Sequence, residues 1–96
     1  MKLPKVTIIV PAFNAEHSIR ECLDSIINQT YKNIEIICVD DGSTDATAKI
    51  IAEYQINDQR ITLIKQKNSG VNEARAVGLA SSTGDYIAWV DSDDTI

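Results

Sequence analysis

Four short apolar runs recur along the chain, and a longer stretch with helical spacing separates each run from the next. The runs cover residues 5–10, 34–39, 61–64 and 85–90 and are rich in valine and isoleucine. Short runs of β-branched residues with defined ends are typical of strands in a buried sheet. Between them, apolar side chains recur every three or four residues, which predicts helices over about 14–29, 43–54 and 69–80.

This alternation predicts the architecture. Strands and helices that alternate with short connections are typical of right-handed crossovers in a parallel sheet. We expect one Rossmann-like α/β domain over residues 1–96, a three-layer sandwich of four mainly parallel strands in the order 3-2-1-4 with helices on both faces. In that order the winding reverses between strands one and four, and ligands bind there, beyond the carboxyl ends of the strands.

The same spacing assigns side chains to the core. The predicted inward positions of the three helices are Ile19, Cys22, Leu23, Ile26 and Ile27, then Thr47, Ile50, Ile51 and Tyr54, then Val71, Ala74, Ala76, Val77 and Ala80. Candidate N-caps are Asn14, Ser43 or Thr44, and Ser69. Gly78 thins the third helix where another element approaches closely. We expect Trp89 in the core, and Cys22 and Cys38 as buried reduced thiols.

The net charge of -5 is local. Six of the 14 acidic residues form two clusters, Asp40, Asp41 and Asp45 and then Asp91, Asp93 and Asp94, and the other eight nearly balance the nine basic residues. Without a basic face, nucleic-acid binding is disfavoured. The apolar runs are far shorter than the roughly 18 residues of a membrane span, and the N-terminus lacks a signal peptide's apolar stretch, so we expect a cytoplasmic protein.

Both acidic clusters directly follow strands, so the predicted topology brings them to one crevice. Carboxylates held close together repel each other unless a cation neutralises them. Mg²⁺ and Mn²⁺ prefer oxygen ligands, and Mg²⁺ is usually held by one or two carboxylates together with substrate phosphates. Either cluster alone also fits ordinary strand ends and helix caps. Both at adjacent strand ends favour a divalent-metal site.

Two common phosphate-binding loops do not fit. A dinucleotide site needs glycines in the first turn, where this chain has Pro11, Ala12 and Phe13. A phosphate loop needs a lysine, and the segment 42–45 has none and ends in Asp45. A phosphate in this crevice therefore needs a metal between it and the carboxylates.

Five motifs carry a resemblance that covers nearly the whole chain. They are IIVPAFNA (8–15), SIINQTY (25–31), VDDGSTD (39–45), GVNEAR (70–75), and GDYI (84–87) continuing to DSDD (91–94). In this order they resemble family 2 glycosyltransferases of the GT-A fold. The resemblance implies an inverting, metal-dependent transfer of a sugar from a nucleotide-diphosphate donor, a UDP-sugar, to an acceptor such as a polysaccharide.

The resemblance also implies site residues. The implied nucleotide-binding set is Pro11, Ala12, Phe13, Asn14, Asp40, Asp41, Gly42, Arg75, Asp91 and Ser92, and the implied metal ligands are Asp93 and Asp91. Pro11 and Phe13 line the base pocket, and Asp41 accepts a hydrogen bond from the base imide, which favours uracil. Arg75 lies near the base and the diphosphate. A Mn²⁺ or Mg²⁺ ion held by Asp93 bridges the phosphates.

The chain departs from the family pattern mainly at its end. Ala76 stands where asparagine is common, and the family's second half, with the acceptor site and general base, does not follow Ile96. We therefore expect residues 1–96 to be the donor-binding part of a truncated GT-A domain without its catalytic base. We also expect self-association through the exposed edge of the fourth strand, and peripheral membrane contact only through the missing region.

Two alternatives stay open at this point. Residues 91–95 fit the Asp-x-Asp-x-Thr motif of haloacid-dehalogenase-like phosphatases, although that motif follows the first strand in that family. The chain could also be a nucleotide-binding remnant that catalyses nothing.

Overall fold

The computed structural model describes residues 3–96 as four strands and three helices. In chain order they are β1 (Val6–Ala12), α1 (Ile19–Ile27), β2 (Ile34–Asp41), α2 (Thr47–Asn57), β3 (Ile61–Gln66), α3 (Val71–Ala80) and β4 (Tyr86–Trp89). The strands form one sheet in the order β3-β2-β1-β4, and every pair is parallel. The predicted α/β architecture and strand order are confirmed.

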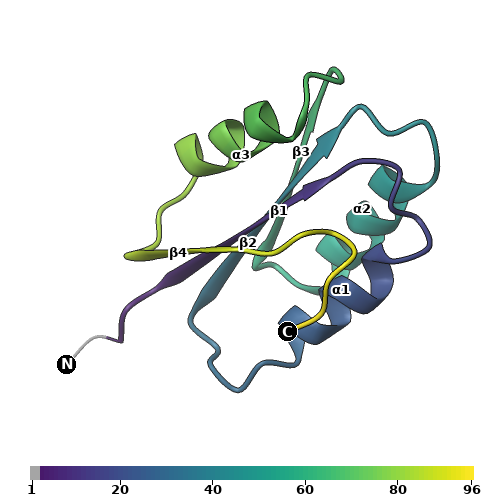
Figure 1. Cartoon of the computed structure of the whole chain (residues 1–96). Helices are drawn as coiled ribbons and strands as arrows, with labels where there is room; N and C mark the ends of the chain where they lie inside the picture. Colours follow the sequence, from purple (N-terminus) through teal and green to yellow (C-terminus); the bar gives the residue numbers. More distant parts are fainter. Residues whose placement is uncertain (1–2) are drawn as a thin grey trace.

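Helices cover both faces of this sheet, as Figure 1 shows. The layer of α1 and α2 buries the larger core cluster, with Ile19, Leu23 and Ile51 fully buried against the sheet. On the opposite face α3 packs over β1 and β2, where the core is much smaller. Residues 34–39 of β2 are covered on both faces as expected, apart from the half-buried Glu35.

Strand β1 runs through Pro11, where the sequence pattern predicted its end. A central strand pairs with a neighbour on each side, and proline has no N–H to donate to either neighbour. The Val90 N–H donates to the Ile9 carbonyl, so Pro11, two residues further on, faces the same side of β1, where β4 has already ended. No β4 partner is needed at Pro11, and β1 continues beside β2 to Ala12.

All three helices begin later than predicted. Asn14 is not the N-cap of α1, because it has a left-handed backbone (φ 46°) and α1 starts only at Ile19. At the start of α2, the Thr47 N–H donates to the Asp45 carboxylate, and neither Ser43 nor Thr44 acts as the predicted N-cap. α3 follows Gly70 (φ 101°), not a Ser69 cap. Asn14, Ser43, Thr44 and Ser69 instead lie in the connections between the strands and the helices that follow them.

The buried side of α3 is narrower than predicted. Ala74 and Gly78 are buried, whereas Val71, Ala76 and Ala80 are exposed, because only one side of the helix meets the sheet. The close approach expected at Gly78 is confirmed, since a Cβ placed there would lie 2.5 Å from Ile9 Cγ2. This contact lets α3 lie directly over β1.

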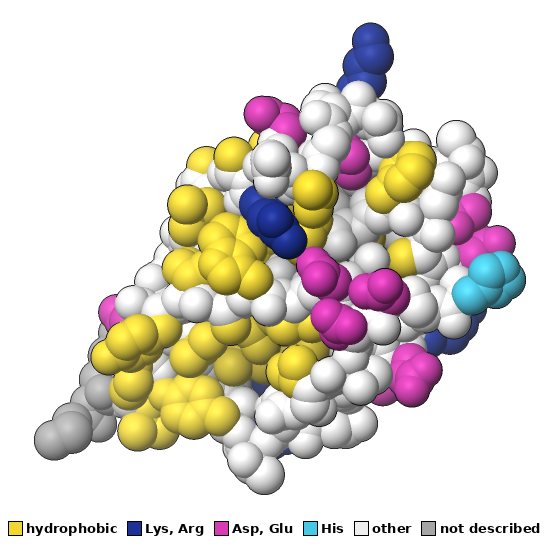
Figure 2. All heavy atoms as spheres, in the orientation of Figure 1, with side chains coloured by type: hydrophobic (Ala, Val, Ile, Leu, Met, Phe, Trp, Pro, Cys, Tyr) yellow, Lys and Arg dark blue, Asp and Glu magenta, His cyan; other side chains and the backbone are white. Residues whose placement is uncertain are grey.

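Trp89 was expected in the core and is 49% exposed. It stands next to Ile9 on the face that α3 covers, but β4 is an edge strand and α3 packs over β1 and β2. Leu79 is also exposed in this region, and Tyr86, which pairs with Val6, is exposed on the opposite face of β4. Figure 2 shows apolar side chains gathered on this side of the molecule.

Both cysteines are buried thiols, as predicted. Burial, followed by the charges of the acidic residues 91–94, raises the pKa of Cys22 to about 11, and burial also raises the pKa of Cys38. Within residues 3–96, no helix has the length and hydrophobicity required to span a membrane.

A polar cluster fixes the amino-terminal end of the sheet. The Glu35 carboxylate accepts hydrogen bonds from Thr7 Oγ1 at 2.7 Å, from the Thr83 N–H at 2.9 Å and from Thr83 Oγ1 at 2.8 Å. Lys5 Nζ lies 3.7 Å from it. These contacts join β1 and β2 to the segment between α3 and β4. Burial opposes ionisation of Glu35, but the hydrogen bonds outweigh it and lower the pKa.

Glu35→Gln is therefore expected to lower the free energy of unfolding at pH 7 by about 1.5–3 kcal/mol, the usual range for hydrogen bonds to charged groups. The folded pKa of Glu35 lies below its ordinary value of 4.5, so this stabilisation is present above that pH. It is lost as the pH falls through the folded pKa. Urea denaturation at pH 7 and at about pH 3 measures the difference, which must shrink at the lower pH. An equal deficit at both pH values contradicts this role.

Candidate functional site

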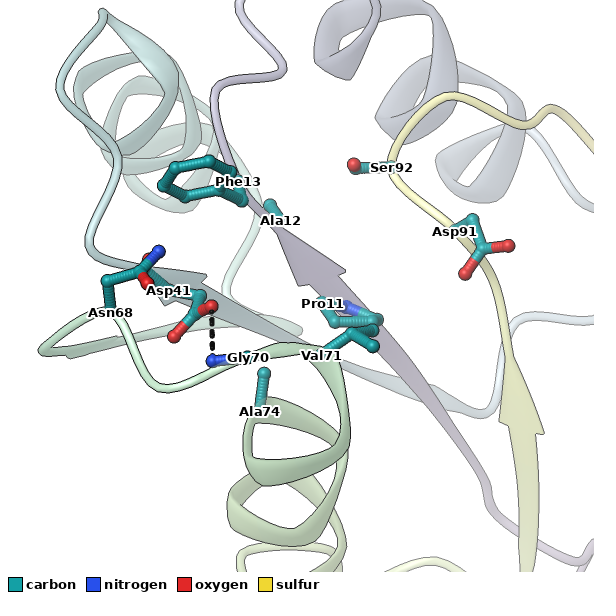
Figure 3. A pocket seen from close by; sticks show the side chains of 10 residues that line it. All are labelled: Pro11, Ala12, Phe13, Asp41, Asn68, Gly70, Val71, Ala74, Asp91 and Ser92. Carbon is teal, nitrogen blue, oxygen red and sulfur yellow. Dashed lines mark hydrogen bonds between the residues drawn. The ribbon is translucent and has the colours of Figure 1, made fainter.

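A cavity of about 360 Å³ opens at the carboxyl ends of the strands. Its lining residues come from the ends of β1 and β2, the β3–α3 connection, the start of α3 and the segment after β4. They are Pro11, Ala12, Phe13, Asp41, Asn68, Gly70, Val71, Ala74, Asp91 and Ser92. The cavity lies where the strand order predicted a ligand site. Figure 3 shows Phe13, Asp41 and Asn68 at one end and Asp91 and Ser92 at the other.

Six of the ten predicted nucleotide-binding residues line this cavity, namely Pro11, Ala12, Phe13, Asp41, Asp91 and Ser92. The other four do not belong to the lining formed by residues 3–96; they are Asn14, Asp40, Gly42 and Arg75. Arg75 stays close to it, because its Nη2 lies 3.5 Å from Asp91 Oδ1. Gly42 (φ 73°) allows the lining residue Asn68 to approach closely, since a Cβ at position 42 would lie 2.6 Å from the backbone nitrogen of Asn68.

Asp40 and Asp41 have different surroundings because successive side chains of a strand point to opposite faces. Asp41 faces the α3 side and the cavity, and Asp40 faces the α1 and α2 side. Asp40 is 3% exposed, and its Oδ1 has no hydrogen-bond partner among the described residues. The two neighbouring aspartates therefore cannot share one role at the cavity.

Asp41 is held as an anion at the floor of the cavity. It is 4% exposed, yet Oδ1 accepts hydrogen bonds from Gln66 Nε2 at 2.9 Å and from the Ser69 N–H at 2.7 Å. Oδ2 accepts one from the Gly70 N–H at 3.0 Å, drawn in Figure 3. The bonds from Gln66 and Ser69, and then from Gly70, lower the pKa of Asp41 below its ordinary value. An ionised carboxylate has about four acceptor sites, so one is left on Oδ2.

Apolar groups surround this acceptor. Pro11, Ala12, Val71 and Ala74 form the walls, and Phe13 is 50% exposed at the rim. Sequence reasoning missed four lining residues, Asn68, Gly70, Val71 and Ala74. The motif GVNEAR marked the last three as a unit, but nothing marked Asn68. Its side chain becomes part of the site because its Nδ2 donates to the Asp41 carbonyl at 3.0 Å.

The opposite end of the cavity is acidic. Oxygen atoms of Asp91, Asp93 and Asp94 lie within 4.8 Å of one another, and all three side chains are exposed. Acidic side chains gather near the middle of the face seen in Figure 2. Helix α1 and the residue before it anchor the segment, because Ser18 Oγ donates to the Ser92 carbonyl at 3.1 Å and Cys22 Sγ donates to the Asp91 carbonyl at 3.5 Å. This donor set fits a hard divalent cation, which prefers carboxylate oxygens.

A parallel sheet with a buried carboxylate and an apolar pocket at its switch point is the arrangement in which α/β domains commonly bind small molecules. The comparisons identify the family. Residues 7–96 match the family model described as Glycosyl transferase family 2, and the chain belongs to that family. This membership decides against the phosphatase alternative.

Two relatives illustrate the match. The chain is 54% identical over 92 residues to glycosyltransferase GlyA of Streptococcus pneumoniae, covering 96% of this chain and 13% of that protein. It is 40% identical over 93 residues to chondroitin synthase of Escherichia coli, covering 97% of this chain and 14% of that protein. The chain therefore spans a small part of the length of each of these relatives.

Solved structures confirm the GT-A type of fold. The structure of TarS residues 1–349 from S. aureus in complex with UDP-GlcNAc is 36% identical with a TM-score of 0.89, over 96% of this chain and 27% of that one. The mannosyltransferase PcManGT from Pyrobaculum calidifontis, in complex with GDP-Man and Mn²⁺, is 31% identical with a TM-score of 0.90, over 96% and 28%.

Proposed function

We propose that residues 1–96 bind the nucleoside diphosphate of a sugar donor, a UDP-sugar, together with Mn²⁺ or Mg²⁺. The observation that carries this proposal is the buried, ionised Asp41 beneath an apolar pocket, with an acidic cluster at the other end of the same cavity. In this role the chain is the donor-binding part of an inverting glycosyltransferase that acts on an acceptor such as a polysaccharide.

At the base end, the Phe13 ring is the stacking face and Asp41 is the acceptor. The remaining acceptor site of the Asp41 carboxylate suits a base that presents an N–H, such as the imide of uracil. Cytosine presents a lone pair at the same position and meets the carboxylate with repulsion. Base stacking on an aromatic ring contributes about 1–3 kcal/mol.

At the other end, Arg75 and the acidic cluster receive the diphosphate. Arg75 carries the positive charge nearest to Asp91 and can exchange this partner for a phosphate oxygen. Asp93 and Asp91 hold the metal in this proposal. A bound Mn²⁺ or Mg²⁺ supplies Lewis-acid stabilisation of the charge that develops on the departing nucleoside diphosphate. The complexes of TarS with UDP-GlcNAc and of PcManGT with GDP-Man and Mn²⁺ support a nucleotide-sugar donor and a divalent metal as the ligands.

Calorimetric titration of the chain with UDP and with CDP, each in Mn²⁺ and in EDTA, tests the proposal. UDP is expected to bind in Mn²⁺ at least about tenfold more tightly than CDP, because the wrong partner leaves a buried acceptor opposed by a lone pair. GDP, which also presents an N–H, shows whether the pocket admits a purine. Equal affinity for UDP and CDP, or no binding of UDP, contradicts the proposal.

We also propose that copies of the chain pair through the outer edge of β4, which has no partner strand within residues 3–96. The N–H groups of Ile87 and Trp89 point away from β1, because those of Tyr86 and Val90 point toward it. An unpaired edge with exposed apolar side chains favours strand addition. Sedimentation velocity is expected to show association at high concentration that Ile87→Pro removes, since proline lacks the outward donor. Ile56→Ser, which removes an 83% exposed apolar residue from α2, must leave association unchanged. A strict monomer at every concentration contradicts this pairing.

A further inference from the structure

Two connections border the base end of the cavity, and a set of hydrogen bonds joins them. One connection follows Phe13 at the end of β1, and the other follows Asp41 at the end of β2. The Asn14 N–H donates to Ser43 Oγ at 2.9 Å, and Asn14 Oδ1 accepts from the Thr44 N–H at 2.8 Å. We call these reciprocal bonds between Asn14 and residues 43–44 the loop clasp.

Further bonds continue the contact away from the cavity. The Glu16 N–H donates to Asp45 Oδ2 at 3.2 Å, and Glu16 Oε2 accepts from the Ala46 N–H at 3.1 Å. The Ala15 N–H donates to Thr47 Oγ1 at 2.8 Å. The two connections are therefore fixed to each other over several residues, and Asn14 is the member of this contact nearest to the cavity.

The conformation at position 14 suits asparagine. The left-handed region is costly for most side chains, and asparagine tolerates it better than others. Its short amide also places an acceptor where the Thr44 N–H points. Glycine can adopt this conformation but offers no acceptor, so Asn14→Gly removes half of the loop clasp with little backbone strain.

Phe13 depends on this arrangement. Its ring is 50% exposed, and it lies between Ala12, the last residue of β1, and Asn14. The backbone on one side of Phe13 is held by the sheet and on the other side by the loop clasp. We propose that Asn14 is a positioning residue, which acts on nucleotide binding through Phe13 and does not contact the base itself. This inference rests on the proposed function, in which Phe13 stacks on the base.

A double-mutant cycle on the 96-residue chain tests this inference, with UDP affinity in Mn²⁺ measured by calorimetry. Asn14→Gly is expected to weaken UDP binding about three- to tenfold, as is Ser43→Ala, which breaks the loop clasp from the other side. In a Phe13→Ala background both changes are expected to cost less than about twofold, because the residue they position is gone. Glu35→Gln is the control, since it lowers stability at the opposite end of the sheet and leaves UDP affinity unchanged.

The outcomes separate this inference from the proposed function. If the unmodified chain does not bind UDP, or if Phe13→Ala leaves the affinity unchanged, the proposed function is wrong at the base end. If Phe13→Ala weakens binding but Asn14→Gly costs the same factor in both backgrounds, Asn14 acts independently of Phe13 and the inference is overturned. No loss with Asn14→Gly overturns it as well.

Discussion

Asp41→Asn is expected to weaken UDP binding by about ten- to a hundredfold, which is the usual cost of losing a charged hydrogen bond. The carboxamide keeps the shape of the side chain but replaces one acceptor oxygen with an NH₂ group, so at least one of the present donors loses its acceptor. Those donors are Gln66 Nε2 and the N–H groups of Ser69 and Gly70. The substitution therefore removes the ionised acceptor and disturbs the β3–α3 connection that forms one wall of the cavity.

The same variant is expected to reduce discrimination between bases. The amide can donate to the lone pair of cytosine, so the preference for UDP over CDP narrows together with the loss of UDP affinity. Calorimetry with both nucleotides measures the two effects. Asp58→Asn is the matched control, because it also removes one negative charge but lies beside Arg60 at the amino-terminal end of the sheet. An unchanged ratio of UDP to CDP affinity in Asp41→Asn excludes Asp41 as the base acceptor.

The fold could be predicted because the spacing of hydrophobic residues leaves few possible arrangements. Four short runs separated by helical stretches permit few arrangements, and the right-handed crossover rule with the common winding selects one. The errors lie where tertiary contacts override local preference. Pro11 stays inside β1 because its neighbour β4 ends early, and Trp89 is exposed because α3 packs over other strands. Neither fact is visible in a run of residues.

The site was predictable in part for the same reason. Residues directly at strand ends, such as Phe13, Asp41 and Asp91, line the cavity because parallel strands bring their carboxyl ends together. Successive side chains of a strand point to opposite faces, so Asp40 and Asp41 cannot both face the cavity. Asn68 lies in the β3–α3 connection, whose path depends on Gly42 and on the hydrogen bonds to Asp41. The spacing of residues in the sequence does not predict such a path.

Asp93→Asn is expected to abolish the gain in UDP affinity that Mn²⁺ gives the chain, a gain we place at about tenfold or more, which corresponds to about 1.4 kcal/mol. The reason is electrostatic. Asp91, Asp93 and Asp94 lie close together and repel a diphosphate unless a cation stands between them. Removing one of these charges weakens the cation site and also weakens the repulsion.

The two consequences have opposite signs, and this makes the prediction specific. In Mn²⁺ the variant binds UDP more weakly than the unmodified chain, whereas in EDTA it binds UDP equally or slightly more tightly. Loss of folding predicts weaker binding in both conditions. Glu73→Gln, which removes an exposed charge from the first turn of α3, must leave the gain from Mn²⁺ intact. If UDP affinity of the unmodified chain is the same with and without metal, the acidic cluster does not bridge a cation to the diphosphate. Asp91, Asp93 and Asp94 are then exposed strand-end residues, with Arg75 beside Asp91.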